Sequence, residues 1–374
     1  MNTLPSQERK RARELGLQIG SLPPGPTNTI TDIPGVLVGH TTLIKGEGYL
    51  VPGKGPIRTG VTAVLPHGKN LFTNPVVATV HIINGFGKAA GLAQLMELGR
   101  IETPILLTST LNVGLVEDAV TEYVIKQNPQ VGISQSTPNP IVAECHDGYL
   151  NDAQGRHIHK EHVFSAIQNA QDTVEEGCVG AGTGMMAFGY KSGIGTASRI
   201  LPKKQGGFTL GSLVVPNCGR RGELVIDGIP ITRIVKDPPT PDVHHDSLEG
   251  GSIVVVLATN APLTSRQLSR LARRAVIGIG RTGSIVSHGS GDFVLAFSTA
   301  FHDKQEESSL TVSRTQLRDK RLTPLFGATV EATEEAIINA LCMATKMTGR
   351  DHHFADALPL NSITQFLQKS SSIF

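Results

Sequence analysis

The sequence predicts a layered, mixed α/β fold, and three observations lead to this prediction. Stretches rich in β-branched residues, typical of strands, alternate with stretches whose apolar residues recur at helical spacing. This alternation breaks down between residues 178 and 260, so strict βαβ units, and with them a Rossmann sheet, are not favoured. Glycine accounts for 41 of the 374 residues, which predicts many tight turns and close backbone approaches.

The strand-like stretches are bounded by glycine or proline. They cover residues 36–42, 60–65, 77–83, 208–215, 223–226, 231–235 and 284–287. Residues 253–259 are continuously apolar, which predicts a strand buried on both faces. Residues 236–249 are polar and rich in proline, so they are expected to be irregular.

The helical stretches each carry an apolar stripe. The stripes contain Leu92, Leu95 and Met96; Val116, Ala119, Val120 and Val124; Val163, Ala166, Ile167 and Ala170; Leu268, Leu271, Ala272 and Ala275; and Ala336, Ile337, Ala340, Leu341 and Ala344. Gly99 stands where the first helix would have its C-cap, and Thr264 or Ser265 is the expected N-cap of the fourth.

Composition and charge exclude several classes of protein. The chain has 34 Lys and Arg against 32 Asp and Glu, and this net charge of +2 gives no broad surface for nucleic acid or an anionic membrane. No apolar run reaches the ~18 residues of a transmembrane helix. The 4 cysteines are far apart, as expected for buried thiols in a reducing compartment. With no secretory signal visible, we expect a cytoplasmic protein.

Several familiar motifs do not fit their usual context. Residues 278–283 match G-x-G-x-x-G, but a helix precedes them and a strand-like stretch follows, which predicts a turn and not a dinucleotide site. Residues 84–88 resemble part of a P-loop but lack its first glycine and the Ser or Thr after Lys88. The pairs His244–His245 and His352–His353 are expected in solvated loops, so we predict neither metal nor cofactor.

The Gly250-Gly251-Ser252 sequence stands where the irregular segment meets the buried strand. If the bond between Gly251 and Ser252 were cut, Ser252 would carry both a hydroxyl and a free α-amine. An α-amine has an unperturbed pKa of about 7.7–8.0, so it can act as the base for its own side chain. A bare glycine before the serine permits the strained geometry that attack on the preceding carbonyl requires. The same tripeptide is also an ordinary turn, and physics alone leaves both interpretations open.

Several dispersed motifs resemble the DmpA-like L-aminopeptidase/D-esterase family, which includes the β-peptidyl aminopeptidases. The resemblance spans about residue 28 to the C-terminus in family order. It is carried by residues 30–39, 84–85, 102–108, 144–152, 179–185, 250–263, 278–281, 290–293, 349–351 and 357–359.

This resemblance implies an αββα sandwich that hydrolyses N-terminal residues from short peptides, amides and esters. Residues 1–28 are then an N-terminal arm and residues 29–374 a single catalytic domain. Autocleavage before Ser252 would give chains 1–251 and 252–374 that stay associated. The resemblance also implies a homo-oligomer, a tetramer of processed protomers, with no metal or organic cofactor and with no nucleic-acid or membrane partner.

The resemblance also assigns roles to individual residues. Ser252 matches the nucleophile, Asn217 the side-chain donor to the oxyanion, and Tyr149 the hydroxyl partner of the nucleophile. Glu144 resembles the carboxylate that binds the substrate's ammonium group. Ser290 and Asp292 are implied to orient or tune the freed amine, although some relatives have Glu at the latter position and Asp is one methylene shorter.

Each of these residues also has a purely structural interpretation, such as a packed tyrosine, a solvated carboxylate or a turn asparagine. Two other functions therefore stay in view. One is an acyltransferase of the ornithine acetyltransferase type, although those enzymes have threonine after the cut. The other is a non-catalytic or nucleotide-binding protein whose glycine-rich turns are only architectural.

Overall fold

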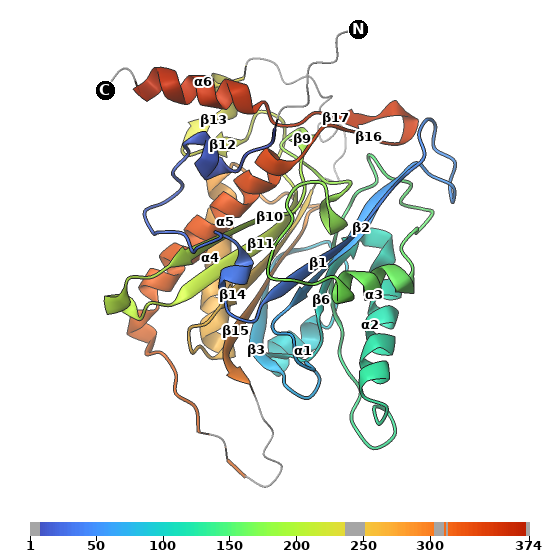
Figure 1. The fold of residues 1–374 in the computed structure, drawn as a ribbon, viewed down its shortest axis with the longest axis vertical. Helices are drawn as coiled ribbons and strands as arrows, with labels where there is room; N and C mark the ends of the chain where they lie inside the picture. Colours follow the sequence, from blue (N-terminus) through green and yellow to red (C-terminus); the bar gives the residue numbers. More distant parts are fainter. Residues whose placement is uncertain (1–7, 236–250, 303–309, 312, 372–374) are drawn as a thin grey trace.

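The structure is a computed structural model that describes residues 8–235, 251–302, 310–311 and 313–371. Two β-sheets lie face to face, and helices cover the outer face of each sheet (Figure 1). This is the αββα arrangement that the family resemblance implied, and not a Rossmann sheet.

The larger sheet has six strands in the order β10-β11-β14-β15-β3-β5. Neighbouring strands are antiparallel except for β14 and β15, which are parallel. Its strands are β3 (Val76–Gly85), β5 (Arg100–Ile101), β10 (Gly195–Ile200), β11 (Thr209–Asn217), β14 (Ser252–Thr259) and β15 (Gly291–His302).

The smaller sheet has five strands in the order β1-β2-β6-β7-β4. Only β6 and β7 in it run parallel, so their carboxyl ends lie side by side. Its strands are β1 (Leu37–Lys45), β2 (Ile57–Leu65), β4 (Ala89–Ala90), β6 (Ile105–Ser109) and β7 (Ile141–Cys145).

The outer layers are built from four of the helices. The helices α4 (Ser265–Arg281) and α5 (Thr323–Met343) pack on the six-stranded sheet, and α2 (Val113–Gln127) and α3 (Lys160–Gln168) pack on the five-stranded sheet (Figure 1). The shorter helices are α1 (Leu92–Glu97) and α6 (Leu360–Ser371).

Short elements complete the described chain. Among the described residues, six two-residue strands outside the two sheets form the hairpins β8 (Met186–Ala187) with β9 (Tyr190–Lys191), β12 (Val225–Ile226) with β13 (Ile229–Pro230), and β16 (Met347–Thr348) with β17 (Phe354–Ala355). The 3-10 helices are η1 (Ala12–Leu15), η2 (Ile30–Asp32), η3 (Thr110–Asn112), η4 (Gly180–Gly182), η5 (Lys203–Gln205), η6 (Ile231–Arg233), η7 (Asp319–Arg321) and η8 (Arg350–His352).

Strand β14 lies at the centre of the molecule and contributes to two cores. Val254 and Val256 belong to the core between the two sheets. Val255 and Leu257 point the other way, into the core shared with α4 and α5. Successive side chains of a strand face opposite sides, so a continuous apolar run is what burial on both faces requires. The expected strand at residues 253–259 is thus confirmed.

The N-terminal residues from 8 onward pack against the sandwich. Ala12, Leu17 and Ile19 are buried in the core that contains α5. Arg13 Nε forms an ion pair of 2.9 Å with Glu335 on α5. The described part of this polar segment therefore covers one side of the α5 layer.

The five predicted helices are all present, and Thr264 caps α4 by accepting a hydrogen bond from Gln267 N at 3.3 Å. Two strand predictions are wrong, since residues 231–233 form a 3-10 helix and residues 284–287 pair with no strand. The predicted turn at residues 278–283 is also wrong for its first part, because α4 continues to Arg281. A Cβ at Gly278 would lie 2.7 Å from the Val330 carbonyl oxygen, so this glycine permits α4 to approach α5 closely.

All four cysteines are free thiols, as expected. Within the described ranges, no helix is both long and apolar enough to cross a membrane. The irregular segment 236–249, with His244 and His245, lies outside the described residues.

Candidate active site

A cavity of about 240 Å³ opens where the ends of both sheets meet. Strands β7 and β11 end here, and β14 and β15 begin here. The segment Phe86 to Lys88 crosses from β3 in one sheet to β4 in the other along the wall of the cavity. Side chains from distant parts of the sequence therefore converge at one edge of the sandwich.

Ser252 is the first residue of β14 and lines this cavity. Its side chain is buried, and its Oγ makes no hydrogen bond within the described residues. The neighbouring Cys145 thiol donates instead to the Val215 carbonyl oxygen at 3.1 Å. Gly251, the residue directly before Ser252, has a φ of 98°, in the left-handed region that favours glycine. Strand β14 thus presents the Ser252 hydroxyl next to the Gly251–Ser252 peptide bond, and the glycine of that bond has a left-handed backbone conformation.

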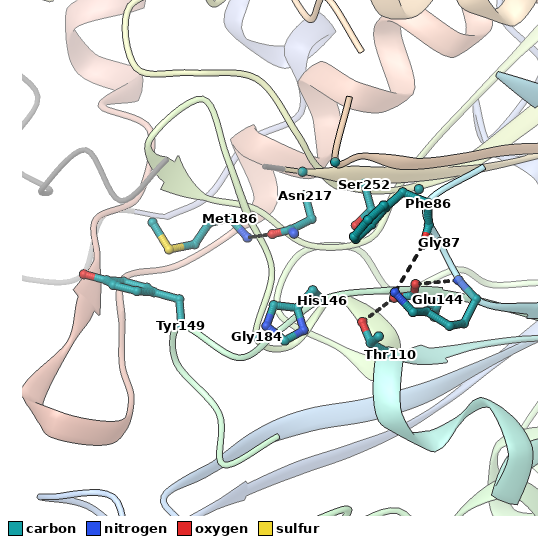
Figure 2. Close-up of a pocket in the computed structure, with 14 residues that line it drawn as sticks. Phe86, Gly87, Thr110, Glu144, His146, Tyr149, Gly184, Met186, Asn217 and Ser252 are labelled. Atoms are coloured by element: carbon teal, nitrogen blue, oxygen red, sulfur yellow. Dashed lines mark hydrogen bonds between the residues drawn. The ribbon is translucent and has the colours of Figure 1, made fainter. Parts of the chain in front are cut away.

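Asn217 ends β11 and lies opposite Ser252 in the antiparallel register. The backbone N–H of Met186 donates to Asn217 Oδ1 at 3.2 Å. Because an N–H can donate only to the amide oxygen, this bond fixes the orientation of the amide. The amide nitrogen therefore faces Ser252, as Figure 2 shows. A free N–H donor next to a hydroxyl is the arrangement that stabilises an oxyanion.

Ser290 and Asp292 stand at the start of β15, beside the start of β14. Ser290 Oγ donates to Asp292 Oδ1 at 2.8 Å, so the shorter carboxylate does reach the serine. Burial raises the pKa of Asp292 to about 6, although hydrogen bonds from Ser290 and the Ile253 backbone act in the opposite direction. The second carboxylate oxygen has no partner among the described residues.

Glu144 lies near the carboxyl end of β7 and is buried in the cavity wall. The backbone N–H of Lys88 donates to its Oε1 at 2.9 Å, and the Thr110 hydroxyl donates to its Oε2. The backbone of the P-loop-like segment therefore binds a carboxylate of this chain. Two fixed donors hold Glu144 in a single orientation, as a binding site for a cation requires.

Tyr149 lies at the edge of the cavity, and its phenol points away from Ser252 (Figure 2). Its ring stacks on His353 with centroids 4.5 Å apart and an interplanar angle of 10°. The structure therefore does not bring the Tyr149 hydroxyl to the nucleophile as the resemblance implied. The stacking also places His353 against the cavity edge, and not in a fully solvated loop.

Several residues of the cavity wall were not predicted from the sequence. Phe86, Thr110, His146 and Met186 line it together with Ser252. Thr110 follows β6, and the parallel pairing of β6 with β7 brings it to Glu144. No motif marks such a residue, because its position depends on strand pairing across 34 residues. Within the described part of the chain, no cluster of side chains is suited to holding a metal ion.

Comparison with known proteins decides the family. The model of Peptidase family S58 matches residues 28–355. This chain belongs to that family. It is 41% identical to the beta-peptidyl aminopeptidase BapA of Sphingosinicella microcystinivorans, over 97% of this chain and 93% of the relative. It is 39% identical to the BapA of Sphingosinicella xenopeptidilytica, over 96% and 91% of the two chains.

Solved structures agree with this assignment. The PH0078 protein of Pyrococcus horikoshii OT3 has 48% identity and a TM-score of 0.91, covering 97% of this chain and 99% of that one. The L-aminopeptidase D-Ala-esterase/amidase of Ochrobactrum anthropi, described as a variant of the Ntn hydrolase fold, has 36% identity and a TM-score of 0.88, covering 96% and 99%.

The S58 protein is therefore a hydrolase of peptide bonds with a fold of the Ntn-hydrolase type. The family resemblance found in its sequence is confirmed. The comparisons support the aminopeptidase interpretation and not the acyltransferase or nucleotide-binding alternatives.

Proposed function

We propose that this protein cleaves itself between Gly251 and Ser252, and that Ser252 then removes N-terminal residues from short peptides, amides and esters. The observation that carries the proposal is the buried Ser252 hydroxyl, which has no hydrogen-bond partner among the described residues, and the Asn217 amide nitrogen that faces it. Relatives named as beta-peptidyl aminopeptidases and as an L-aminopeptidase and D-Ala-esterase/amidase support this substrate class.

Self-cleavage needs only groups that this chain supplies, together with water. Ser252 Oγ bonds to the Gly251 carbonyl carbon, and the C–N bond between the two residues breaks. The hydroxyl proton passes to the departing nitrogen, which becomes the α-amine of Ser252. Water then hydrolyses the resulting ester, leaving residues 1–251 with a carboxylate and residues 252–374 with a free amino terminus.

In the mature enzyme, the α-amine of Ser252 takes the proton from its own Oγ as that oxygen attacks the substrate carbonyl. Asn217 Nδ2 donates to the oxyanion that forms, an interaction typically worth ~10²–10³ in rate. The substrate's amine leaves with the proton, and water hydrolyses the acyl-enzyme. Ser290 and Asp292 act on the α-amine from the adjacent strand.

Glu144 accounts for the choice of substrates with a free amino terminus. Its carboxylate lies in the same cavity as Ser252 and is held by donors on both oxygens. It binds the ammonium group of the substrate, and a blocked or uncharged N-terminus leaves this buried carboxylate without a cation. Phe86, His146 and Met186 form walls that the substrate side chain meets.

Ser252→Ala is the direct test of this function. We expect it to give one uncleaved chain of 374 residues without aminopeptidase activity, whereas the wild type gives two chains, the smaller beginning at Ser252. Intact mass under denaturing conditions measures cleavage, and release of amine from an amino-acid anilide measures activity. Ser252→Cys keeps a nucleophile and is the control that should still cleave.

An active, uncleaved Ser252→Ala protein would rule out this function. The tetrameric assembly and the cytoplasmic location that the sequence analysis expected stay predictions.

A further inference from the structure

We propose that Lys191 is a positioning residue that orients the oxyanion donor Asn217 through the Met185–Met186 peptide group. The inference rests on the proposed role of Asn217. Neither the sequence motifs nor the family resemblance pointed to Lys191, which lies in β9 outside the cavity wall.

The hairpin of β8 and β9 docks on the end of β11. Its turn residues Phe188 and Gly189 both have positive φ, 53° and 75°, as a tight two-residue hairpin requires. The Phe188 N–H donates to the Cys218 carbonyl at 2.9 Å, and the Met186 N–H donates to Asn217 Oδ1 at 3.2 Å. The hairpin therefore controls the side chain that faces Ser252.

Lys191 is the cross-strand partner of Met186 in this hairpin and is fully buried. Its Nζ donates to the carbonyl oxygens of Gly182 at 3.2 Å and Met185 at 3.0 Å, and also to that of Ser192. The three carbonyl oxygens match the three N–H groups of an ammonium, and the Cys178 thiol is a further hydrogen-bond partner of the same group. No carboxylate pairs with Lys191 in the described residues; the ionisable group that faces it is the Cys178 thiol.

The connection to the active site runs through one planar unit. The Met185 carbonyl that accepts from Lys191 and the Met186 N–H that donates to Asn217 belong to the same peptide bond. A peptide group is rigid, so fixing its oxygen fixes the direction of its N–H. The hydrogen bond from Lys191 also polarises the peptide group and strengthens its N–H as a donor.

Loss of the Lys191 bond leaves the Met185 carbonyl oxygen with the Ser192 backbone N–H, at 3.0 Å, as its other donor, and it loosens the restraint on Asn217. The Met186 N–H is the donor that Asn217 Oδ1 has in the described structure. Without it, the amide nitrogen is no longer held toward Ser252. The effect of Lys191 on catalysis therefore depends on the presence of Asn217.

The test is a double-mutant cycle of Lys191→Met and Asn217→Ala, with kcat and KM normalised to folded, processed enzyme. We expect Lys191→Met to lower kcat by about 10- to 100-fold, less than the ~10²–10³ expected for Asn217→Ala, with KM almost unchanged. In the Asn217→Ala background, we expect Lys191→Met to leave kcat unchanged, because the group it orients is gone.

Arg58→Met is the matched control. Arg58 is also a buried cation that donates to backbone carbonyls, at 2.7 Å to Thr348 and 3.1 Å to Lys45, and among the described residues none of its hydrogen bonds goes to the β8–β9 hairpin or to Asn217. We expect this variant to lower thermal stability and to leave kcat of the folded fraction intact. If Lys191→Met does not fold, Lys191→Gln, whose amide keeps two N–H donors on a shorter side chain, takes its place.

The outcomes separate the two hypotheses. If Asn217→Ala keeps wild-type kcat, the proposed oxyanion role fails. If Asn217→Ala is impaired but Lys191→Met is not, or if Lys191→Met lowers kcat equally in both backgrounds, the positioning role of Lys191 is overturned. Where a variant is not processed, its cleavage rate by intact mass replaces kcat in the same cycle.

Discussion

At the scale of single residues, Asp292 shows how burial changes a carboxyl group. Its pKa of about 6 lies well above the ordinary value of 3.8, since burial penalises the charged form more than its hydrogen bonds stabilise it. A carboxyl group whose pKa is raised by folding contributes stability below its unfolded pKa, and this stability is lost as pH rises through the folded pKa.

We therefore expect Asp292→Asn to become increasingly stabilising, relative to Asp, between pH 4 and pH 7. The comparison is made in uncleaved Ser252→Ala protein, so that no α-amine faces the site. The gain above pH 7 is at most about 3 kcal/mol, from about two pKa units at 1.36 kcal/mol each. Melting temperatures of the two proteins across this pH range measure it, and a difference that is constant with pH would contradict the raised pKa.

The sequence contained most of the residues proposed for the active site but not the groups that hold them in place. Ser252, Asn217, Glu144, Ser290 and Asp292 stand in motifs that are recognisable in order along the chain, and the structure brings them to one edge of the sandwich. Thr110 and Lys191 belong to no motif. Thr110 contributes through a hydrogen bond to Glu144, which is distant in sequence, and Lys191 contributes through a hydrogen bond to the Met185 backbone carbonyl. Tyr149 shows the converse, since its motif is present but stacking on His353 turns it away.

At the scale of elements, α4 shows why helices were easier to predict than strands. Its buried residues repeat at helical spacing within one segment, and Thr264 provides a local start signal. The pairing of β14 with β15, or of β6 with β7, depends on partners elsewhere in the chain. Residues 284–287 have the composition of a strand but no neighbour to pair with, and so they form none.

The two faces of α4 should respond differently to truncation. Leu271 is 1% exposed and packs in the core with α5, whereas Ile277 on the same helix is 52% exposed. We expect Leu271→Ala to lower the free energy of unfolding by about 2–5 kcal/mol and Ile277→Ala by less than about 0.5 kcal/mol. Denaturant unfolding of the uncleaved Ser252→Ala protein measures both, and equal losses would contradict this packing.

At the scale of the whole molecule, a buried charge network joins the N-terminal segment, β10 and α5. Arg199 on β10 is fully buried and pairs with Glu335 at 2.6 Å and with Glu331 at 3.0 Å, and Arg13 pairs with the same Glu335. The composition gave no sign of this network, because charged residues in a polar segment ordinarily face water. The described N-terminal residues, from 8 onward, are therefore packed and ion-paired against β10 and α5, and they do not form a separate arm.

Removal of Arg199 should destabilise the whole fold. Arg199→Met leaves Glu331 and Glu335 buried with less compensation, and we expect a loss of about 3–5 kcal/mol. The control is Arg266→Met, whose ion pair with Asp319 is exposed to solvent and contributes little to stability. Thermal unfolding compares the two variants, and a similar small effect for both would show that the network contributes little.

The order of the six-stranded sheet has a consequence for the protein once it is cleaved as we propose. A cut before Ser252 assigns β14 and β15, in the middle of the sheet, to one polypeptide, while β10 and β11 on one flank and β3 and β5 on the other stay with its partner. Neither fragment retains the whole six-stranded sheet, so the two cannot separate without exposing the cores on both of its faces. Once unfolded, they must find each other again in a second-order reaction that slows with dilution. The cleaved protein, which folded as a single chain, is therefore expected to refold poorly after its two chains dissociate. Its lifetime is then set by its rate of unfolding, that is, by kinetic stability.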